Sequence, residues 1–326
     1  MKTEILRCLR EAEGYVSGQE LCERLKVSRT AVWKVMQQLQ AEGYEIEAVR
    51  NRGYRLKESG DAYSQAELQS IMSSKWAGKN LLFFEKVDST NNMVRTLAEQ
   101  GAPEGTLVVA ANQTAGKGRR GRSWSAPEGT SIAMSILLRP EFPPERASML
   151  TLVMAMAIAR GIREVTGLDA GIKWPNDIVA DGKKLCGILT EMSTEMEYIR
   201  YVVIGIGINV SMKEFPEELK QKATSLELCL GRPVKRAPLI DACMRAFEEY
   251  YEKYLQTLDL SLLQEEYNRE LVNVGREVTV LAPAGDYTGV SHGINREGEL
   301  VVELAGGEIR NVVSGEVSVR GVYGYV

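Results

Sequence analysis

The sequence predicts an α+β protein built of three domains in series, and three observations lead to this prediction. Residues 1–58 have the pattern of short helices followed by two alternating strands. Residues 64–270 interleave strands with helices, which indicates a central α/β domain with a mixed sheet. Residues 271–326 hold five short, alternating, glycine-rich segments, which favours a small β-barrel.

The N-terminal domain has the pattern of a helix-turn-helix. Residues 19–25 predict a short helix, and Ser28 is a good N-cap for a second helix that runs to about residue 42. The residues of this second helix that we expect to be buried are Val32, Val35, Met36 and Leu39. Trp33 could pack in the core as well or flank the DNA-facing surface, and packing in the core is favoured.

Two alternating strands at residues 44–49 and 53–56 complete a winged helix, with cations at the tip of the wing. This arrangement suits DNA, because a recognition helix enters the major groove while wing cations contact phosphates. The residues expected to bind DNA are Ser28, Arg29, Thr30, Lys34, Gln37, Arg50 and Arg52. The alternative is a winged helix that binds proteins, with its basic face merely exposed to solvent.

A polar linker at residues 57–62 leads to the second domain, which opens with a capping box at Ser64 and Glu67. The second domain is predicted to hold strands at 80–87, 106–112, 131–138, 171–174, 186–191 and 201–210. Its helices are predicted at 90–100, 144–166 and 238–256. The third domain is predicted to be an SH3-like barrel with strands at 277–281, 287–294, 299–304, 309–313 and 316–320.

Residues 116–122 alternate three glycines with four cations and are the most informative segment of the chain. Glycine lets a backbone come close to a ligand, and arginine binds phosphate or carboxylate with paired hydrogen bonds. The segment contains Gly-x-Gly-x-x-Gly, yet no helix follows it, so it does not fit a dinucleotide fold. No Gly-Lys-Ser/Thr closes it, so it is not a P-loop either. It lies between two strands, which makes it a candidate lid over an anionic ligand.

Four further segments carry groups that suit the same ligand. Residues 88–92 supply hydroxyls and amides, residues 171–177 end in Lys-Trp-Pro-Asn-Asp, and residues 183–191 bring Lys184 to the start of a strand. Gly205 and Gly207 alternate on another strand and leave one of its faces bare for a flat ligand. Each segment alone has an ordinary structural explanation, but together they indicate one binding site.

These motifs, in this order, resemble those of the biotin protein ligases. They read Asp-Ser-Thr-Asn from residue 88, Gly-Lys-Gly-Arg-Arg-Gly-Arg from 116, Lys-Trp-Pro-Asn-Asp from 173, Lys-Leu-Cys-Gly-Ile-Leu from 184 and Gly-Ile-Gly-Ile-Asn from 205. The N-terminal domain is similar to that of the bifunctional members, which also repress the biotin operon. The resemblance covers the whole chain. Two departures are Lys117, where the family often has Arg, and Cys186, where it often has a small residue.

The resemblance implies a class II synthetase-like central domain and a ligase that works in two steps. Biotin is first activated by ATP, with Mg²⁺, to biotinyl-5′-AMP. It then passes to a lysine of the biotin carboxyl carrier domain of acetyl-CoA carboxylase or another biotin-dependent carboxylase. The resemblance also implies binding to operator DNA of the biotin genes, as a homodimer when the adenylate is bound.

The same resemblance implies roles for particular residues. Catalytic roles fall to Lys184, Arg119 and Asp177, the last also as a candidate Mg²⁺ ligand. The residues implied to bind biotin are Ser89, Thr90, Asn91, Gln113, Lys117, Gly118, Arg119, Trp124, Lys184, Gly187, Gly205 and Gly207. The residues implied to bind the nucleotide are Arg119, Arg122, Asn176, Lys184, Asn209 and Arg320.

Two other functions remain open. A lipoate or octanoate protein ligase shares this kind of fold, and some related transferases use a Lys–Cys pair, to which Lys184 and Cys186 would correspond. The Gly-Arg-rich loop and the DNA-binding arm argue against it. A regulatory DNA-binding protein that senses a metabolite without turnover is the second alternative.

Composition excludes several further classes. The net charge of −4 gives no overall basic field that would draw the chain to nucleic acid. Five cysteines are scattered without a Cys-x-x-Cys, which predicts a reducing cytosol and no zinc site. The only histidine, His292, rules out His-based triads. The N-terminus lacks the apolar run of a signal peptide, and the apolar residues 150–159 are too few to span a bilayer, so we expect a cytoplasmic protein without membrane association.

Overall fold

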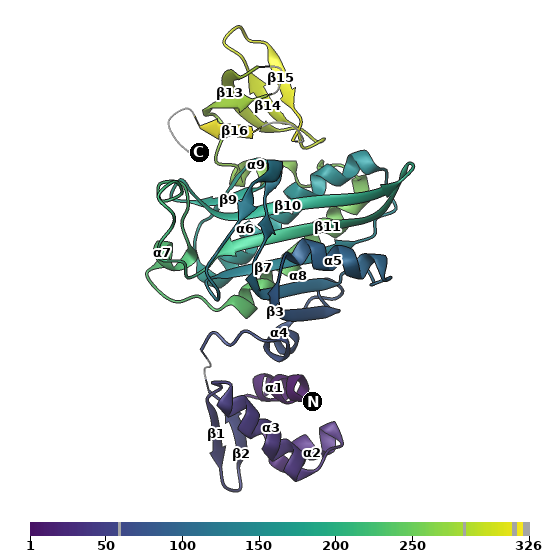
Figure 1. Cartoon of the computed structure of the whole chain (residues 1–326), viewed down its shortest axis with the longest axis vertical. Coiled ribbons are helices and arrows are strands. Elements are labelled where there is room, and N and C mark those ends of the chain that lie inside the picture. Colours follow the sequence, from purple (N-terminus) through teal and green to yellow (C-terminus); the bar gives the residue numbers. More distant parts are fainter. Residues whose placement is uncertain (58–59, 283–284, 315–317, 322–326) are drawn as a thin grey trace. The chain divides into compact units, whose positions relative to one another are not determined.

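A computed structural model describes residues 1–57, 60–282, 285–314 and 318–321 (Figure 1). By their contacts, the residues form two compact units. The first comprises Met1–Ser73 with Lys235–Asp241, and the second comprises Ser74–Val234 with Ala242–Val326. The domain boundaries expected from the sequence, 1–58, 64–270 and 271–326, stay predictions.

Three helices and a two-stranded wing form the winged helix of the first unit (Figure 1). They are α1 (Lys2–Glu11), α2 (Gly18–Leu25), α3 (Arg29–Ala41), β1 (Ile46–Val49) and β2 (Gly53–Leu56). Ser28 caps α3 by accepting a hydrogen bond from the Ala31 amide, as expected. The α3 side chains expected to be buried share one core with Ile5, Leu6 and Leu9 of α1, a helix that the sequence analysis did not predict.

Trp33 does not pack in this core, so the prediction made for it was wrong. Its side chain is 54% exposed. Successive residues of a helix are turned by about 100° from one another, so the burial of Val32 and Met36 against the core turns Trp33 towards solvent. The indole therefore lies on the surface of α3, one turn from Arg29 and one turn from Gln37.

Helix α4 (Gln65–Ile71) belongs to the same unit and is held to the winged helix by a buried carboxylate. Glu67, only 4% exposed, accepts hydrogen bonds from Arg10 of α1 at 2.5 Å and from the Tyr44 hydroxyl at 2.8 Å. Ser64 caps α4 by accepting from the Glu67 amide, which confirms that half of the expected capping box. Burial and the Glu67 charge raise the pKa of Tyr44 above its ordinary value, so its hydroxyl stays protonated and donates.

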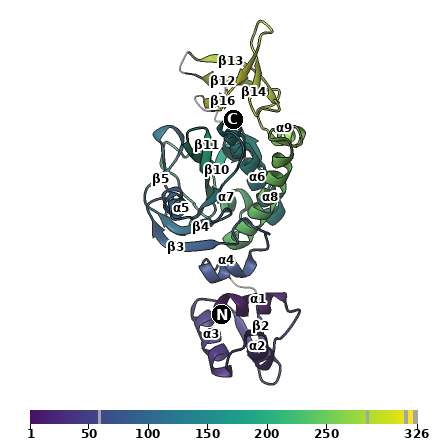
Figure 2. The same ribbon diagram turned by 90° about the vertical axis from the view of Figure 1, so that its right-hand side faces the viewer.

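A seven-stranded mixed sheet forms the centre of the second unit. Its order is β3-β4-β7-β11-β10-β9-β8, with β3 and β4 parallel and all other neighbours antiparallel. The strands are β3 (Leu81–Val87), β4 (Leu107–Gln113), β7 (Ser131–Leu138), β8 (Gly171–Lys173), β9 (Asp177–Ala180), β10 (Lys183–Glu195) and β11 (Tyr198–Asn209). Figure 2 shows helix α5 (Thr90–Glu99) on one face of the sheet and α6 (Leu150–Thr166) on the other, with α8 (Arg236–Thr257) beside α6. Within the described residues no helix is long and apolar enough to cross a membrane.

The strands and helices predicted for the central domain are found, but two short helices, at 226–230 and 264–270, were not predicted, and three further differences concern the strands and the loop. Strands β10 and β11 run past the predicted 186–191 and 201–210 because they pair with each other as one long hairpin. Strand β9 was not predicted, since four residues carry little periodic signal. The Gly-Arg-rich loop is also more regular than expected, because β5 (Gly116–Lys117) pairs with β6 (Ser123–Trp124) across a short 3₁₀ turn (Arg119–Gly121).

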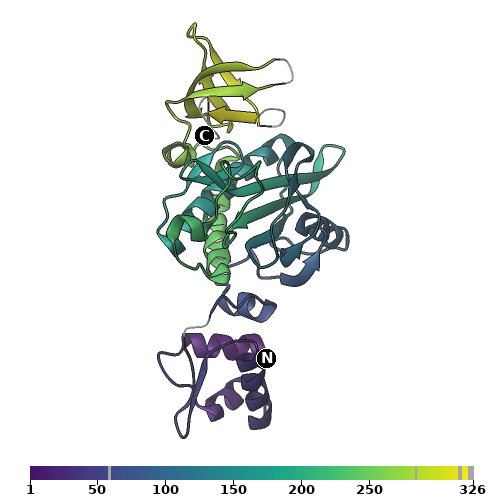
Figure 3. The same ribbon diagram turned by 60° about the vertical axis from the view of Figure 1, so that its left-hand side comes forward.

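Five antiparallel strands form a further sheet at the C-terminal end of the second unit, in the order β15-β14-β13-β12-β16 (Figure 3). They are β12 (Glu277–Leu281), β13 (Tyr287–Ile294), β14 (Leu300–Glu303), β15 (Ile309–Val312) and β16 (Ser318–Gly321). This is the set of strands expected for a small SH3-like barrel. Two short helices precede it, α7 (Leu226–Leu230) and α9 (Gln264–Glu270).

Candidate functional site

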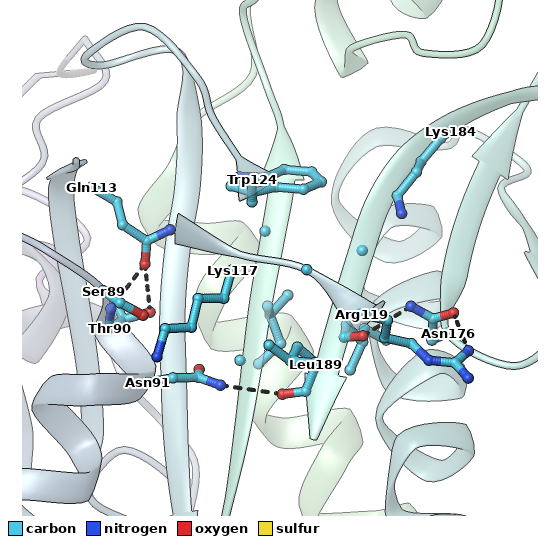
Figure 4. Close-up of a pocket in the computed structure, with 16 residues that line it drawn as sticks. Ser89, Thr90, Asn91, Gln113, Lys117, Arg119, Trp124, Asn176, Lys184 and Leu189 are labelled. Carbon is cyan, nitrogen blue, oxygen red and sulfur yellow. Dashed lines mark hydrogen bonds between the residues drawn. The ribbon is translucent and has the colours of Figure 1, made fainter. Parts of the chain in front are cut away.

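The sequence motifs meet in one pocket beside the sheet (Figure 4). The pocket is lined by Ser89, Thr90, Asn91, Gln113, Lys117, Gly118, Arg119, Trp124, Asn176, Lys184, Gly187, Ile188, Leu189, Gly205, Ile206 and Gly207. Every residue that the resemblance assigned to biotin is among them. The lining residues that the sequence analysis missed are Ile188, Leu189 and Ile206, ordinary strand residues with no chemical signal of their own.

Glycines on two adjacent strands make the floor of the pocket. Gly207 of β11 pairs with Gly187 of β10, and Gly205 faces the same side two residues earlier. A Cβ atom at Gly205 would lie 2.1 Å from Asn91 Oδ1, and one at Gly207 would lie 2.5 Å from the Trp124 ring. A Cβ atom at either position would displace Asn91 or Trp124. Strand β11 carries no side chain at these two positions, as its sequence shows, but Asn91 and Trp124 cover them.

Hydroxyl and amide groups at one end of the pocket are tied together (Figure 4). Thr90 donates to Gln113 Oε1 through its backbone N–H at 2.8 Å and its hydroxyl at 3.2 Å. The fully buried Ser135 hydroxyl lies 2.7 Å from Thr90 Oγ1 and 2.6 Å from Asn91 Oδ1, while Asn91 Nδ2 donates to Glu191 at 2.7 Å. These bonds orient the pocket-lining amides. Neither supporting residue was expected at the site, because Ser135 lies in an ordinary strand and Glu191 only ends the segment 183–191.

Trp124 of β6 covers the glycine floor. Its ring lies over Gly207, and the Lys184 ammonium is 6.0 Å from the ring centroid. The indole Nε1 is buried and has no hydrogen-bond partner among the described residues. A buried donor without an acceptor is costly, so the pocket favours a ligand that offers an acceptor beside this ring.

Arg119 reaches from the loop to two other parts of the second unit. It donates to Asn176 Oδ1 at 3.0 Å and to the backbone carbonyl of Ser314, which follows β15. Burial lowers the pKa of the Arg119 guanidinium, Asp177 raises it, and two neighbouring loop arginines lower it again. A bound anion would offset both the burial and the repulsion among the arginines.

Lys184 and Cys186, two residues apart on β10, have different surroundings. Lys184 lines the pocket and donates to Asp177 Oδ1 at 2.5 Å. Cys186 pairs with Ile208, not with a floor glycine, and is fully buried outside the lining. Burial raises the pKa of the Cys186 thiol well above its ordinary value, so it is neither accessible nor ionised.

Four of the expected site residues lie outside the lining. Asp177 accepts a hydrogen bond from Lys184, which does line the pocket. Asn209 is 4% exposed and donates to the carbonyl of Thr224, which accounts for its amide without a ligand. Arg122 is exposed on the loop. Arg320 lies on β16, and its side chain is outside the described residues. Its nucleotide contact stays a prediction, as do the other assigned roles.

In the first unit, all the residues expected to bind DNA are exposed. Several cations on this surface are held in place by neighbours. Arg29 donates to Gln19 Oε1 at 2.9 Å, and the guanidinium groups of Arg52 and Arg55 lie 4.5 and 5.1 Å from the centroid of the Tyr15 ring. The wing arginines are thus oriented before any phosphate binds.

Three family models match successive parts of the chain. Residues 83–209 match the biotin/lipoate A/B protein ligase family, whose description names both biotin and lipoate ligases. Residues 2–55 match an HTH domain, and residues 274–320 match the biotin protein ligase C-terminal domain.

A bifunctional ligase/repressor BirA of Bacillus subtilis (strain 168) is 41% identical over 307 residues, which cover 93% of each chain. The chain belongs to the biotin protein ligases. The BirA of Escherichia coli (strain K12) is 30% identical over 308 residues, 93% of this chain and 92% of that one. The solved biotin protein ligase from Aquifex aeolicus in complex with biotin and ATP is 32% identical, with a TM-score of 0.67 over 74% of this chain and 99% of that chain. The expected family and fold class are confirmed.

Ser135→Ala tests the hydrogen bonds that support the pocket of this biotin protein ligase. Because a buried donor next to Thr90 and Asn91 is lost, we expect the free energy of unfolding to fall by about 1–2 kcal/mol. Ser148→Ala is the control, since the Ser148 hydroxyl is exposed and makes one contact of 3.4 Å. It should change stability by less than about 0.5 kcal/mol. Chemical denaturation measures both variants. Equal losses of unfolding free energy in Ser135→Ala and Ser148→Ala would show that Ser135 does not support the site.

Proposed function

We propose that this protein activates biotin with ATP and transfers it to a lysine of a carrier protein. In the first step a biotin carboxylate oxygen bonds to the α-phosphorus of ATP, and pyrophosphate leaves. In the second, the neutral lysine amine bonds to the acyl carbon of biotinyl-5′-AMP, loses its proton, and AMP leaves. The observation that carries the proposal is the pocket itself, with hydroxyl and amide groups at one end, Lys184 and Arg119 at the other, and glycine strands between them.

The pocket suits the three parts of biotin. The ureido group needs donors and acceptors, which Ser89, Thr90 and Gln113 supply. The fused rings are apolar and would pack in the pocket beside Trp124 and the glycine strands. The carboxylate would then extend towards Lys184 and the loop, where cations gather.

Charge at the reacting centre is the main demand of the first step. Two anions, the carboxylate and the α-phosphate, have to be held together, and fixed cations do this without reorganising during the reaction. Lys184 and Arg119 supply that charge in our proposal. Asp177 orients the Lys184 ammonium, and Asn176 together with the Ser314 carbonyl orients Arg119.

We also propose Mg²⁺ as a companion of ATP. Among the described residues, no three His, Cys, Asp or Glu side chains converge as metal ligands. This fits Mg²⁺, which is usually bound by one or two carboxylates together with substrate phosphates. Asp177 is the carboxylate that we assign to it. The ion would neutralise phosphate charge as pyrophosphate leaves.

A lipoate or octanoate transfer that uses a Lys–Cys pair is disfavoured. The Cys186 thiol is fully buried, lies outside the pocket lining and has a raised pKa, so it does not supply a nucleophilic thiolate to this pocket.

Lys184→Ala should slow biotin-dependent exchange between ATP and labelled pyrophosphate by about 100-fold or more, because a donor to developing charge is lost. Lys183→Ala is the matched control, since its side chain is next in sequence but absent from the lining. Cys186→Ala should leave the exchange rate nearly unchanged. Similar losses in the Lys184 and Cys186 variants would favour thiol chemistry. No biotin-dependent exchange by the wild type would favour a regulator without turnover.

Arg119→Gly should release biotinyl-5′-AMP more than it slows its synthesis, because glycine cannot make the paired contacts that hold an anhydride. Released adenylate labels lysines of bystander proteins such as serum albumin, so that labelling should rise. Arg120→Gly is the matched control, since Arg120 is exposed, is absent from the lining and has a φ of 57°, which glycine adopts readily. Bystander labelling that stays at the wild-type level while carrier labelling falls would contradict this role.

We propose that the same protein represses biotin genes by binding their operator as a homodimer when the adenylate is bound. Its carrier partner would be the biotin carboxyl carrier domain of acetyl-CoA carboxylase or of another biotin-dependent carboxylase. A single winged helix reads few base pairs, so useful specificity needs two half-sites related by a two-fold axis. We propose the cytoplasm as its location, because carrier and operator are both met there.

Dimer formation should strengthen when biotin and ATP are supplied together. The adenylate would relieve repulsion among the loop arginines and order the loop, so a second subunit loses less conformational entropy on docking. Linkage then requires that dimers on DNA retain the adenylate more tightly by the same factor. Analytical ultracentrifugation and operator titrations of the empty and adenylate-bound forms measure both effects. Equal dimerisation and equal operator affinity in the two forms would mean that the protein is a ligase whose DNA-binding arm is not controlled by the adenylate.

A further inference from the structure

The surface of α3 carries a large apolar side chain where polar ones surround it. In the described part of the winged helix, the exposed large hydrophobic residues are Met1, at the chain end, and Trp33, each 54% exposed. Trp33 is the fifth residue of α3. Single exposed hydrophobic residues are common. This one, however, lies in the N-terminal half of α3, and the N-terminal residues of the corresponding helix contact base edges in helix-turn-helix proteins.

The neighbours of Trp33 favour nucleic acid over a protein partner. Helical spacing brings Arg29, Thr30 and Gln37 beside the indole, at three or four residues' distance. All of them are exposed, and so is Lys34. Residues 24–41 contain four cations and no acidic residue. The core of a protein interface is depleted of charged residues, whereas this surface is one indole within a cationic and amide-rich face.

We propose that Trp33 is a specificity-determining residue that contacts the 5-methyl groups of thymines in the major groove of the operator. The thymine methyl is the apolar group that base pairs present in that groove, and side chains recognise it by apolar contact. Arg29 and Lys34 can bind phosphates or guanine, and Gln37 can bind adenine. The indole would recognise thymine, which these neighbours do not. The proposal rests on the operator binding proposed above.

The test uses the full-length protein with biotin, ATP and Mg²⁺. A pool of random-sequence DNA duplexes is first enriched for those that the wild-type protein binds, and the duplex bound most tightly becomes the probe. Each thymine is then replaced in turn by deoxyuridine, which keeps base pairing and lacks only the methyl group. At the contacted position we expect wild-type affinity to fall about fourfold per half-site, the equivalent of ~0.8 kcal/mol for one buried methyl-sized group.

Variants assign the effect to the indole. Trp33→Ala should bind the thymine probe more weakly and should no longer distinguish thymine from uracil at that position. Trp33→Phe should keep part of the discrimination, because phenyl is apolar too. Gln38→Ala is the matched control, since Gln38 is exposed on the same helix but five residues away and so projects in a different direction. The Gln38→Ala variant should keep the wild-type ratio between its affinities for the thymine probe and the uracil probe. Unchanged ligase activity in every variant shows that the second unit is intact.

Two results would overturn the proposal while operator binding stands: a wild-type protein indifferent to uracil at every position, or a Trp33→Ala variant that keeps the wild-type ratio. Weaker self-association of that variant with an unchanged ratio would assign the indole to a protein contact instead. Failure of the wild type to enrich any duplex would overturn operator binding itself, and this proposal with it.

Discussion

Asn91 and Trp124 lie against the backbone of β11 at two positions that have no room for a side chain. The missing Cβ atoms of Gly205 and Gly207 allow distances at which any other residue would collide with the amide or the indole. This close approach brings α5, the Gly-Arg-rich loop and the sheet together around one pocket. The pocket depends on it, because a single methyl group on the floor would displace one wall or the other.

The two ends of that pocket offer different groups. At one end, hydroxyls and amides are mutually bonded through Ser135 and Gln113, so their orientation is set before a ligand arrives, and the Lys117 ammonium lies beside them. At the other end, Lys184 and Arg119 are held by acceptors on separate elements. A molecule with a hydrogen-bonding polar head and an anionic tail suits this arrangement, and preorganised groups of this kind do not have to reorganise during a reaction.

The first unit is built on a second buried contact. Glu67 of α4 would be unstable in a core without partners, and Arg10 with Tyr44 provides them. This contact makes α4 part of the same compact unit as the winged helix, although the sequence suggested a linker between them.

The sequence by itself determined three local features: the helix cap at Ser28, the alternating pattern of β12 and β13, and the motifs whose residues line the pocket. Each depends on residues close in the chain, so local patterns and family motifs reveal it. Only the tertiary structure decided which way Trp33 and Cys186 face, and which buried groups Ser135 and Glu67 serve. Those outcomes depend on contacts between distant segments, such as β7 with α5 or α1 with α4, and no local pattern encodes them.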